Sequence, residues 1–195
     1  MRSGRNHRCG RLNRIEIPPH EDRHYPEGKI NTAVLSIGAN LGDRLQTLRS
    51  AVRSISTLPG VWLAGVSSVY ETPPWGPVEQ PNFLNAVVLV NVRESLDPID
   101  FLHSLQRIES EHGRTREVHW GPRTLDIDII VLNDVISSGP ELVLPHPHAS
   151  ERGFVLVPWS ELVPEAEIPG VGTVRSLLDS LDTTIVMKMP GLSLT

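Results

Sequence analysis

Hydrophobic residues along the chain change from strand-like to helix-like spacing between positions 37 and 44. A short apolar run over 33–37 predicts a buried strand. From 44 to 58, apolar residues recur at helical spacing and predict an amphipathic helix. Asp43 precedes this helix as a candidate N-cap and Pro59-Gly60 ends it. A strand, a tight loop and a helix are therefore expected to open the fold.

Three more strands and one more helix are predicted further along the chain. The strands are expected over 61–71, 83–92 and 125–132. A proline-rich loop over 72–81 separates the first two of these strands. The helix is expected to start at Asp97-Pro98, which provides an N-cap and a proline at the first position, and to end at Gly113.

The predicted order of elements is βαββαβ, the ferredoxin-like arrangement of an α+β fold, in which helices pack on one face of an antiparallel sheet. Additional short strands are expected near Val135 and Leu142, and additional helices near Glu151 and over 173–181. With 195 residues and 39% hydrophobic content, the chain can form one sizeable core. Residues 31–195 are therefore expected to form a single domain.

Charge and cysteine usage narrow the range of functions. Residues 1–30 carry seven Lys or Arg against four Asp or Glu, although the whole chain has a net charge of −5. We expect this basic stretch to be a disordered extension, and the acidic remainder argues against a nucleic-acid-binding body. The single cysteine, Cys9, cannot form an internal disulfide, which favours the cytoplasm. No apolar run is long enough for a membrane span or a secretory signal.

The strongest chemical signal lies between positions 114 and 128. Three arginines precede Asp126 and Asp128, which alternate on an apolar run and should share one face of a strand, roughly 6.6 Å apart. Two bare carboxylates at that distance repel by roughly 2.5 kcal/mol at an effective dielectric of about 20. Magnesium would relieve this repulsion, since it commonly binds through one or two carboxylates and substrate phosphates. The arginines would clamp the rest of a polyphosphate.

Other features are ambiguous when taken alone. A solvated pair on an edge strand would explain an isolated Asp-x-Asp, but the adjacent arginines favour a metal site. The loop over 38–43 lacks the lysine and the glycine spacing of a phosphate loop, so its glycines are expected to serve a tight turn. His146 is expected to be structural or to contact phosphate, because too few Cys or His lie nearby for zinc. Arg152 either joins His146 on one ligand or is an ordinary surface arginine.

Two tryptophans are candidates for ligand contacts. Trp75 and Trp120 both lie in loops beside Gly-Pro pairs, where large apolar side chains more often cover a ligand than fill a core. A flat heteroaromatic substrate would suit them. The prolines of the loop over 72–81 restrict its conformations, which lowers the entropic cost of using it as a binding wall.

Five separated motifs point to one family. They read Gly-Ala-Asn-Leu-Gly-Asp from 38, Tyr-Glu-Thr-Pro-Pro-Trp-Gly-Pro from 70, Gln-Pro-Asn-Phe-Leu-Asn-Ala from 80, Trp-Gly-Pro-Arg-Thr-Leu-Asp-Ile-Asp from 120, and Leu-Pro-His-Pro from 144. Over about 33–164, the chain resembles the 6-hydroxymethyl-7,8-dihydropterin pyrophosphokinases of folate biosynthesis. The resemblance implies transfer of pyrophosphate from ATP to the hydroxymethyl oxygen of the pterin, with attack on the β-phosphorus and release of AMP.

The resemblance also implies the roles of individual residues. Two magnesium ions would be held by Asp126 and Asp128. The residues expected to act in catalysis are Arg114, Arg116, Arg123, Asp126 and Asp128. Those expected to contact ATP are Gln106, Arg114, Arg116, His146 and Arg152. Those expected to line the pterin pocket are Thr72, Pro73, Trp75, Phe83, Asn85, Trp120 and Phe154. Asn85 would read the polar edge of the pterin, and the two phenylalanines would cover its faces.

His119 departs from the family pattern, which usually has Arg or Lys before Trp-Gly-Pro-Arg. We hypothesise that ATP affinity falls as pH rises through the titration of His119, near an unperturbed pKa of about 6.5. Residues 112–123 have the composition of a mobile cover, whose opening can limit product release. Two alternatives remain for removal of the proton from the attacking hydroxyl. Asp128 could accept it, or a metal that bridges the hydroxyl oxygen could lower the pKa of the hydroxyl.

The expected partners are ATP and the hydroxymethyl dihydropterin, and the protein is expected to act as a monomer without nucleic acid or membrane. One alternative is a non-catalytic ferredoxin-like ligand-binding or regulatory module, since this topology hosts many functions. Such a module has no need for two metal-binding carboxylates beside a polyphosphate clamp. A second alternative is a kinase that transfers a single phosphate, which would release ADP rather than AMP.

Overall fold

The computed structural model describes residues 29–74, 79–113 and 122–195. Its first elements are β1 (Ile30–Ala39), α1 (Arg44–Ser56), β2 (Val61–Val66), β3 (Tyr70–Thr72), β4 (Phe83–Arg93), α2 (Pro98–Glu111) and β5 (Asp126–Leu132). They are followed by β6 (Ser137–Ser138), β7 (Val143–Leu144), the 3-10 helix η1 (Ala149–Glu151), α3 (Gly153–Leu162), β8 (Glu167–Ile168), β9 (Gly172–Thr173), α4 (Val174–Leu178) and β10 (Met187–Lys188). Most of the extension expected over 1–30 lies outside the described residues.

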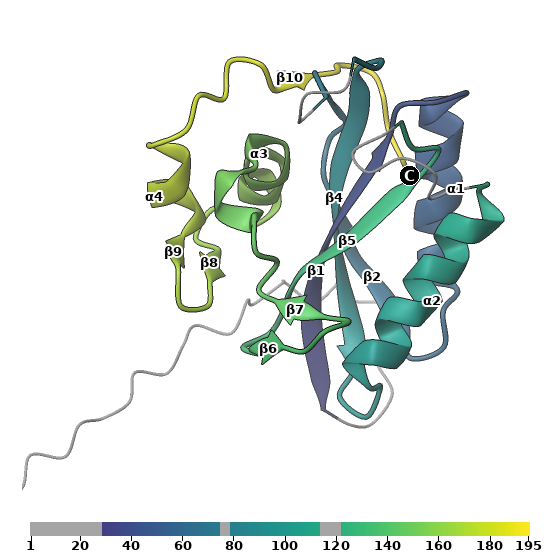
Figure 1. Ribbon diagram of the computed structural model, residues 1–195, viewed down its shortest axis with the longest axis vertical. Helices are drawn as coiled ribbons and strands as arrows, with labels where there is room; N and C mark the ends of the chain where they lie inside the picture. Colours follow the sequence, from purple (N-terminus) through teal and green to yellow (C-terminus); the bar gives the residue numbers. More distant parts are fainter. Residues whose placement is uncertain (1–28, 75–78, 114–121) are drawn as a thin grey trace, which may run out of the picture.

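The main sheet has six strands, and all its described pairs are antiparallel. Its order is β10-β3-β4-β1-β5 (Figure 1). Strand β2 also pairs with β4, along the same edge of β4 as β3. The long strand β4 pairs with β1 along one side, from Ala39↔Leu84 to Ile30↔Arg93. The core order β1, α1, β2/β3, β4, α2, β5 confirms the ferredoxin-like α+β prediction.

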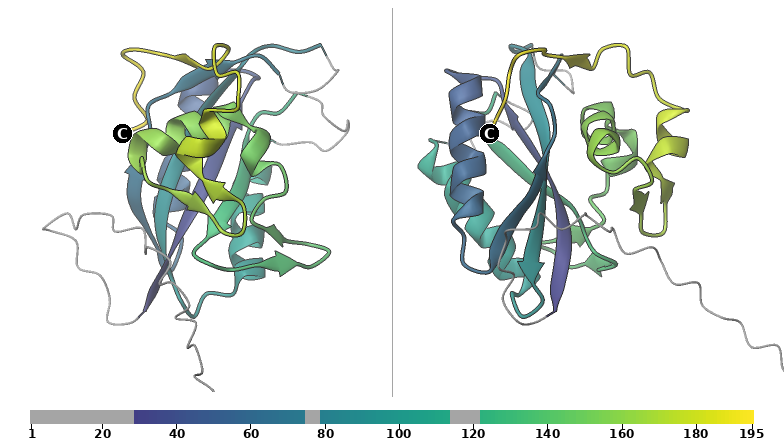
Figure 2. Two further views of the ribbon diagram at one scale, coloured as in Figure 1. Left: turned by 90° about the vertical axis from the view of Figure 1, so that its left-hand side faces the viewer. Right: turned by 180° about the vertical axis from the view of Figure 1, so that it is seen from behind.

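Helices cover both faces of this sheet. Helices α1 and α2 lie on one face, while α3 and α4 lie on the other (Figures 1 and 2). Strand β1 shows why both faces are apolar, since Leu35 and Ile37 join the core under α1 and α2, whereas Val34 joins the core under α3. The ferredoxin-like pattern predicts the first helical layer. The second layer follows from the C-terminal part of the chain.

One predicted strand is wrong in its extent. The stretch over 61–71 is divided into β2 and β3, and the division falls at Ser67. The amide of Ser67 donates to the Val87 carbonyl at 2.9 Å, and its Oγ accepts the Val87 amide, also at 2.9 Å. A side chain thus replaces a backbone acceptor at this point of the ladder, and the chain re-enters the sheet as β3.

The predicted helix starts are confirmed. The Asp43 side chain accepts from the Gln46 amide at 3.1 Å, and the Asp97 side chain accepts from the Ile99 amide at 2.8 Å. Each bond satisfies an amide that has no partner within the helix. In α2, Phe101 is fully buried. No helix within the described ranges is long and apolar enough to cross a membrane.

Candidate functional site

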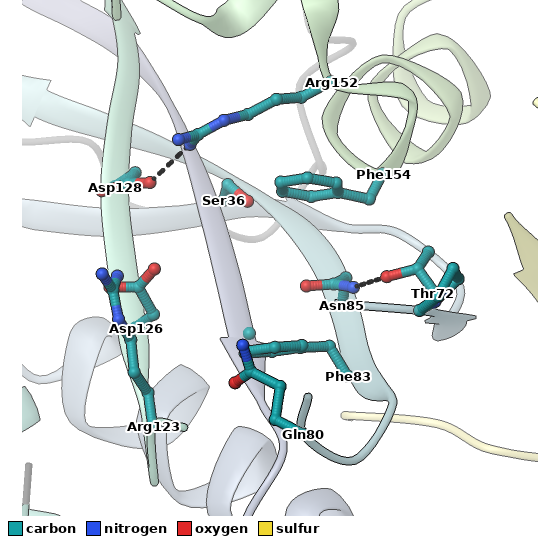
Figure 3. Close-up of a pocket in the computed structure, with 12 residues that line it drawn as sticks. Ser36, Thr72, Gln80, Phe83, Asn85, Arg123, Asp126, Asp128, Arg152 and Phe154 are labelled. Atoms are coloured by element: carbon teal, nitrogen blue, oxygen red, sulfur yellow. Dashed lines mark hydrogen bonds and ion pairs between the residues drawn. The ribbon is translucent and has the colours of Figure 1, made fainter. Parts of the chain in front are cut away.

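A cavity with about 630 Å³ of atom-free space, part of it open to solvent, lies on the α3 face of the sheet. It is lined by Ser36, Gly38, Thr72, Pro73, Gln80, Phe83, Asn85, Arg123, Asp126, Asp128, Arg152 and Phe154. Figure 3 shows charged side chains from β5 on one side and the β4 side chains Phe83 and Asn85 on the other. We call these two sides the acidic wall and the ring wall. A concave site that combines apolar and polar groups is suited to a small ligand.

The acidic wall follows from the alternation of β5. Asp126 and Asp128 face the cavity, whereas Ile127 and Ile129 are buried in the core under α1 and α2. The shared face expected for the two aspartates is confirmed. Their side chains remain 21% and 31% exposed, so each carboxylate can still reach a ligand.

Each aspartate is paired with an arginine. Arg123 Nη1 lies 2.6 Å from Asp126 Oδ1, and Arg152 Nη1 lies 3.0 Å from Asp128 Oδ2. The Arg152 guanidinium also lies 5.6 Å from the ring centroid of Phe154, within the range of a cation–π contact. Arg152 also lines the cavity and its side chain is only 13% exposed, so it is not an ordinary surface arginine.

His146 touches the acidic wall as a neutral group. Its Nε2 lies 3.8 Å from Asp128 Oδ2, and its backbone amide donates to the Ile130 carbonyl at 2.8 Å. Burial, together with the nearby charge of Arg152, lowers the pKa of His146 from 6.5 to about 4. His146 therefore presents an uncharged imidazole beside Asp128 at neutral pH.

The ring wall is built from neutral groups. Asn85 and Thr72 are each 4% exposed, and Asn85 Nδ2 donates to Thr72 Oγ1 at 2.7 Å (Figure 3). Gly38 lies on the neighbouring strand, where a Cβ atom would be 2.7 Å from Asn85 Oδ1. A glycine is required at this position for the Asn85 amide to lie across β1. The hydrogen bond to Thr72 orients the Asn85 amide before any ligand binds.

Hydrogen bonds connect helix α3 to strand β3, which contributes Thr72 to the ring wall. The Glu161 carboxylate accepts from the Tyr70 hydroxyl at 2.6 Å and from the Ser68 hydroxyl at 2.7 Å. Lys188 of β10 lies 3.6 Å from the same carboxylate. These contacts join α3, which carries Phe154, to β3, which ends at Thr72.

Several residues at or beside the cavity were not identified from the sequence. Ser36 faces the cavity from β1 and pairs in register with Asp128, while Gln80 reaches it from the segment before β4. Glu109 of α2 is only 2% exposed and accepts the Ile127 amide at 2.7 Å, directly between the two aspartates. Alternation along the strand predicted over 33–37 could have placed Ser36 on one face of the sheet. Gln80 begins one of the five motifs but had no assigned role, and no local pattern distinguishes Glu109.

Some expected site residues are not among those that line the cavity. Gln106 lies half-buried on α2, outside the lining. Arg114, Arg116, His119 and Trp120 lie outside the described residues, as does Trp75. The expected cover over 112–123 also falls largely outside them.

The two aspartates provide the kind of donors that magnesium prefers, since it takes oxygen ligands and keeps several waters. Within 29–74, 79–113 and 122–195, no group of three or more His, Cys, Asp or Glu side chains is arranged to hold a metal. Two carboxylates that leave room for phosphate and water fit magnesium better than a closed protein cage.

The fold is antiparallel α+β, and its cavity combines two carboxylates, arginines and aromatic rings. This combination is typical of an enzyme that acts on a small, phosphate-containing substrate. The chain belongs to the 7,8-dihydro-6-hydroxymethylpterin-pyrophosphokinase family, whose model matches residues 34–164. The resemblance inferred from the five motifs is thereby confirmed.

Curated relatives carry the same enzyme name, 2-amino-4-hydroxy-6-hydroxymethyldihydropteridine pyrophosphokinase. The Pseudomonas aeruginosa protein is 35% identical over 83% of this chain and 99% of its own length. The Bacillus subtilis protein is 44% identical over 70% of this chain and 81% of its own length. The Methylorubrum extorquens protein is 42% identical over 80% and 98% of the two chains.

Solved structures support the fold independently. The Plasmodium falciparum HPPK-DHPS wild type with pterin and p-hydroxybenzoate matches with a TM-score of 0.61 and 18% identity. This match covers 80% of the present chain but only 44% of that longer chain. A triple mutant of the same protein gives a TM-score of 0.63. At this identity the likeness concerns the fold alone.

Proposed function

We propose that this protein transfers pyrophosphate from ATP to the hydroxymethyl group of 6-hydroxymethyl-7,8-dihydropterin, a step of tetrahydrofolate biosynthesis. The hydroxymethyl oxygen attacks the β-phosphorus, the bond from that phosphorus to the α,β-bridging oxygen breaks, and AMP leaves. Family membership supports this activity. The observation that carries it in the structure is one cavity with an acidic wall facing a ring wall.

At the ring wall, the pterin would stack between apolar faces and present its polar edge to an amide. Phe83 and Phe154 supply aromatic faces from β4 and α3 (Figure 3). Asn85 supplies an amide whose nitrogen is engaged by Thr72, which leaves its oxygen as an acceptor for the ring. Pro73 closes the wall beside Thr72. Trp75 and Trp120, outside the described residues, complete the proposed pocket.

At the acidic wall, arginines would align the triphosphate. Arg123 and Arg152 already face the cavity, and Arg114 and Arg116 are proposed to join them from the segment after α2. Gln106 and the neutral His146 are proposed as further ATP contacts. Catalysis of such a transfer consists mainly of positioning and of stabilising charge on the phosphoryl oxygens.

Asp126 and Asp128 are proposed to hold two magnesium ions. Bound magnesium neutralises phosphate charge and favours ionisation of the attacking hydroxyl. In exchange, Arg123 and Arg152 would turn from the carboxylates toward the phosphates. In this exchange no charge is left alone, because magnesium replaces each arginine beside its carboxylate and phosphate replaces each carboxylate beside its arginine.

We further propose that the enzyme acts as a cytoplasmic monomer, without nucleic acid or membrane as partners. The single cysteine supports a reducing compartment, and the acidic character of residues 31–195 disfavours nucleic acid. Residues 31–195 are proposed to form one domain, preceded by a disordered basic extension.

The decisive experiment identifies the nucleotide product. The protein is incubated with magnesium, ATP and the hydroxymethyl dihydropterin, and the nucleotides are separated. AMP is expected in equal amount to pterin pyrophosphate, and a pterin without the hydroxymethyl group serves as the control. ADP would instead indicate transfer of a single phosphate. If the folded protein converts no nucleotide, the non-catalytic module becomes the better explanation.

A further inference from the structure

The loop after β1, which resembles a phosphate loop only superficially, contains a buried asparagine. Asn40 is 2% exposed, and its side chain uses both its donor and its acceptor. Its Nδ2 donates to Gln80 Oε1 at 2.9 Å and to the Pro81 carbonyl at 3.1 Å. Its Oδ1 accepts the Arg123 amide at 2.8 Å, and its own amide donates to the Arg123 carbonyl at 3.1 Å.

These partners belong to opposite walls of the cavity. Gln80 and Pro81 lie in the segment between β3 and β4, from which Gln80 lines the cavity near Phe83 (Figure 3). Arg123 lies just before β5, lines the cavity, and pairs with Asp126 at 2.6 Å. One carboxamide therefore joins residues that are 43 positions apart in the chain.

We call the hydrogen bonds of Asn40 to Gln80, Pro81 and Arg123 the junction. Its chemistry requires an amide side chain. The carboxamide of asparagine donates through its nitrogen and accepts through its oxygen at the same time. Aspartate would keep the acceptor for the Arg123 amide, but it would place a charged oxygen against the Pro81 carbonyl oxygen and force the Gln80 side-chain amide to turn its nitrogen inward. Asn40 thereby holds the side chain of Gln80 where it lines the cavity beside Phe83 (Figure 3).

We propose that Asn40 is a positioning residue. It fixes the position of the acidic wall relative to the ring wall, so that bound pterin and bound triphosphate are aligned for the transfer. This inference rests on the proposed function. Asn40 touches neither substrate. It acts on the pterin through Gln80 and on the phosphates through Arg123.

The junction has two arms: the bonds from Asn40 Nδ2 to Gln80 and Pro81, and the bond that Asn40 Oδ1 accepts from the Arg123 amide. Two substitutions distinguish between them. Asn40→Asp breaks the bond to the Pro81 carbonyl and forces the Gln80 amide to turn its nitrogen toward the new carboxylate, while preserving the acceptor for Arg123. It should weaken pterin binding about tenfold and change ATP binding by less than about threefold. Asn40→Ala removes both arms, and it should weaken binding of both ligands and lower kcat as well. Gln80→Ala combined with Asn40→Asp should bind pterin no worse than Gln80→Ala alone, because both act through one contact.

Asn91→Ala is the matched control, since Asn91 is also a buried asparagine, 5% exposed, but lies six positions along β4 from Asn85. It should lower the melting temperature without changing either affinity. Affinities are measured by calorimetry with the pterin alone and with magnesium-ATP alone, and AMP formation is measured separately. Wild type that binds both ligands but forms no AMP would contradict the proposed function and leave the junction testable. Folded Asn40 variants with wild-type affinities, or Asn40→Asp weakening both ligands equally, would overturn the positioning role.

Discussion

The two walls of the cavity are built on different physical principles. On the acidic wall, Asp126 and Asp128 are partly exposed, and each is paired with an arginine that a ligand can replace. On the ring wall, Asn85 and Thr72 are buried and hydrogen-bonded to each other, and Gly38 leaves space for their packing. The acidic wall is therefore suited to exchange partners when charged ligands arrive. The ring wall is suited to recognise one flat molecule without rearrangement.

The largest expected effect tests the acidic wall. Asp126→Ala or Asp128→Ala should lower turnover by about a thousandfold or more, because loss of a metal-binding carboxylate removes several kcal/mol of charge stabilisation. The variants should stay folded, since both side chains are partly exposed. AMP formation and thermal unfolding are the measurements. Asp134→Ala, in the exposed turn after β5, is the control. Full activity in either aspartate variant would remove the acidic wall from the mechanism.

A smaller effect is expected at the ring wall. Gly38→Ala places a Cβ against Asn85 Oδ1 and should raise the KM for pterin about tenfold, while the KM for ATP stays unchanged. Gly65→Ala on β2 is a matched control, because its Cβ would meet only ordinary contacts at 3.7 Å and beyond. An equal rise in both KM values would show that the two walls are not independent.

The support of the acidic wall can be tested at Glu109. Glu109→Ala should cost about 2 kcal/mol of folding stability, because the buried Ile127 amide loses its acceptor. It should also weaken magnesium-dependent nucleotide binding, since that amide lies between the two aspartates. Glu109→Gln keeps an acceptor and should restore much of both properties. Denaturant unfolding and calorimetry measure them. A glutamine variant as defective as the alanine variant would assign the role to the charge rather than to the acceptor.

His146 predicts how stability depends on pH. Its pKa falls from 6.5 in the unfolded chain to about 4 in the folded protein, so the unfolded state binds the extra proton between these values. Stability should therefore decrease as pH falls from about 6.5 toward 4. His146→Gln should flatten this part of the curve, whereas His103→Gln, at an exposed histidine, should not. Identical slopes for wild type and His146→Gln in denaturant unfolding would contradict the assignment.

The smallest expected effect concerns ATP affinity and pH. Without nucleotide, the pKa of His146 is about 4, so this histidine is uncharged near neutrality. His119, outside the described residues, remains the predicted cause of a decline in ATP affinity as pH rises through about 6.5. The decline should be no more than about fivefold, as for an exposed charge pair. His119→Arg should abolish it in calorimetric titrations. Parallel profiles for the two proteins would refute this prediction.

The sequence determined the features that depend on neighbouring residues. Alternation along β5 placed Asp126 and Asp128 on one face, and the capping residues Asp43 and Asp97 marked the helix starts, because strand and helix periods are local properties of the chain. Separated motifs were sufficient to indicate the family. The division of the predicted strand at Ser67 was not foreseen, since it depends on a hydrogen bond to Val87, 20 positions away.

Tertiary structure decided which residues support the site. Gly38 and Asn40 belong to a motif that helped to indicate the family, and Glu109 belongs to none, yet the role of each depends on a partner brought next to it by the packing of the sheet and helices. The pKa of His146 was likewise lowered mainly by burial in the folded protein, with smaller contributions from the charges of Arg152 and His148. Hydrogen bonds, close contacts and desolvation depend on distance in space, and that distance is fixed only when the chain has folded.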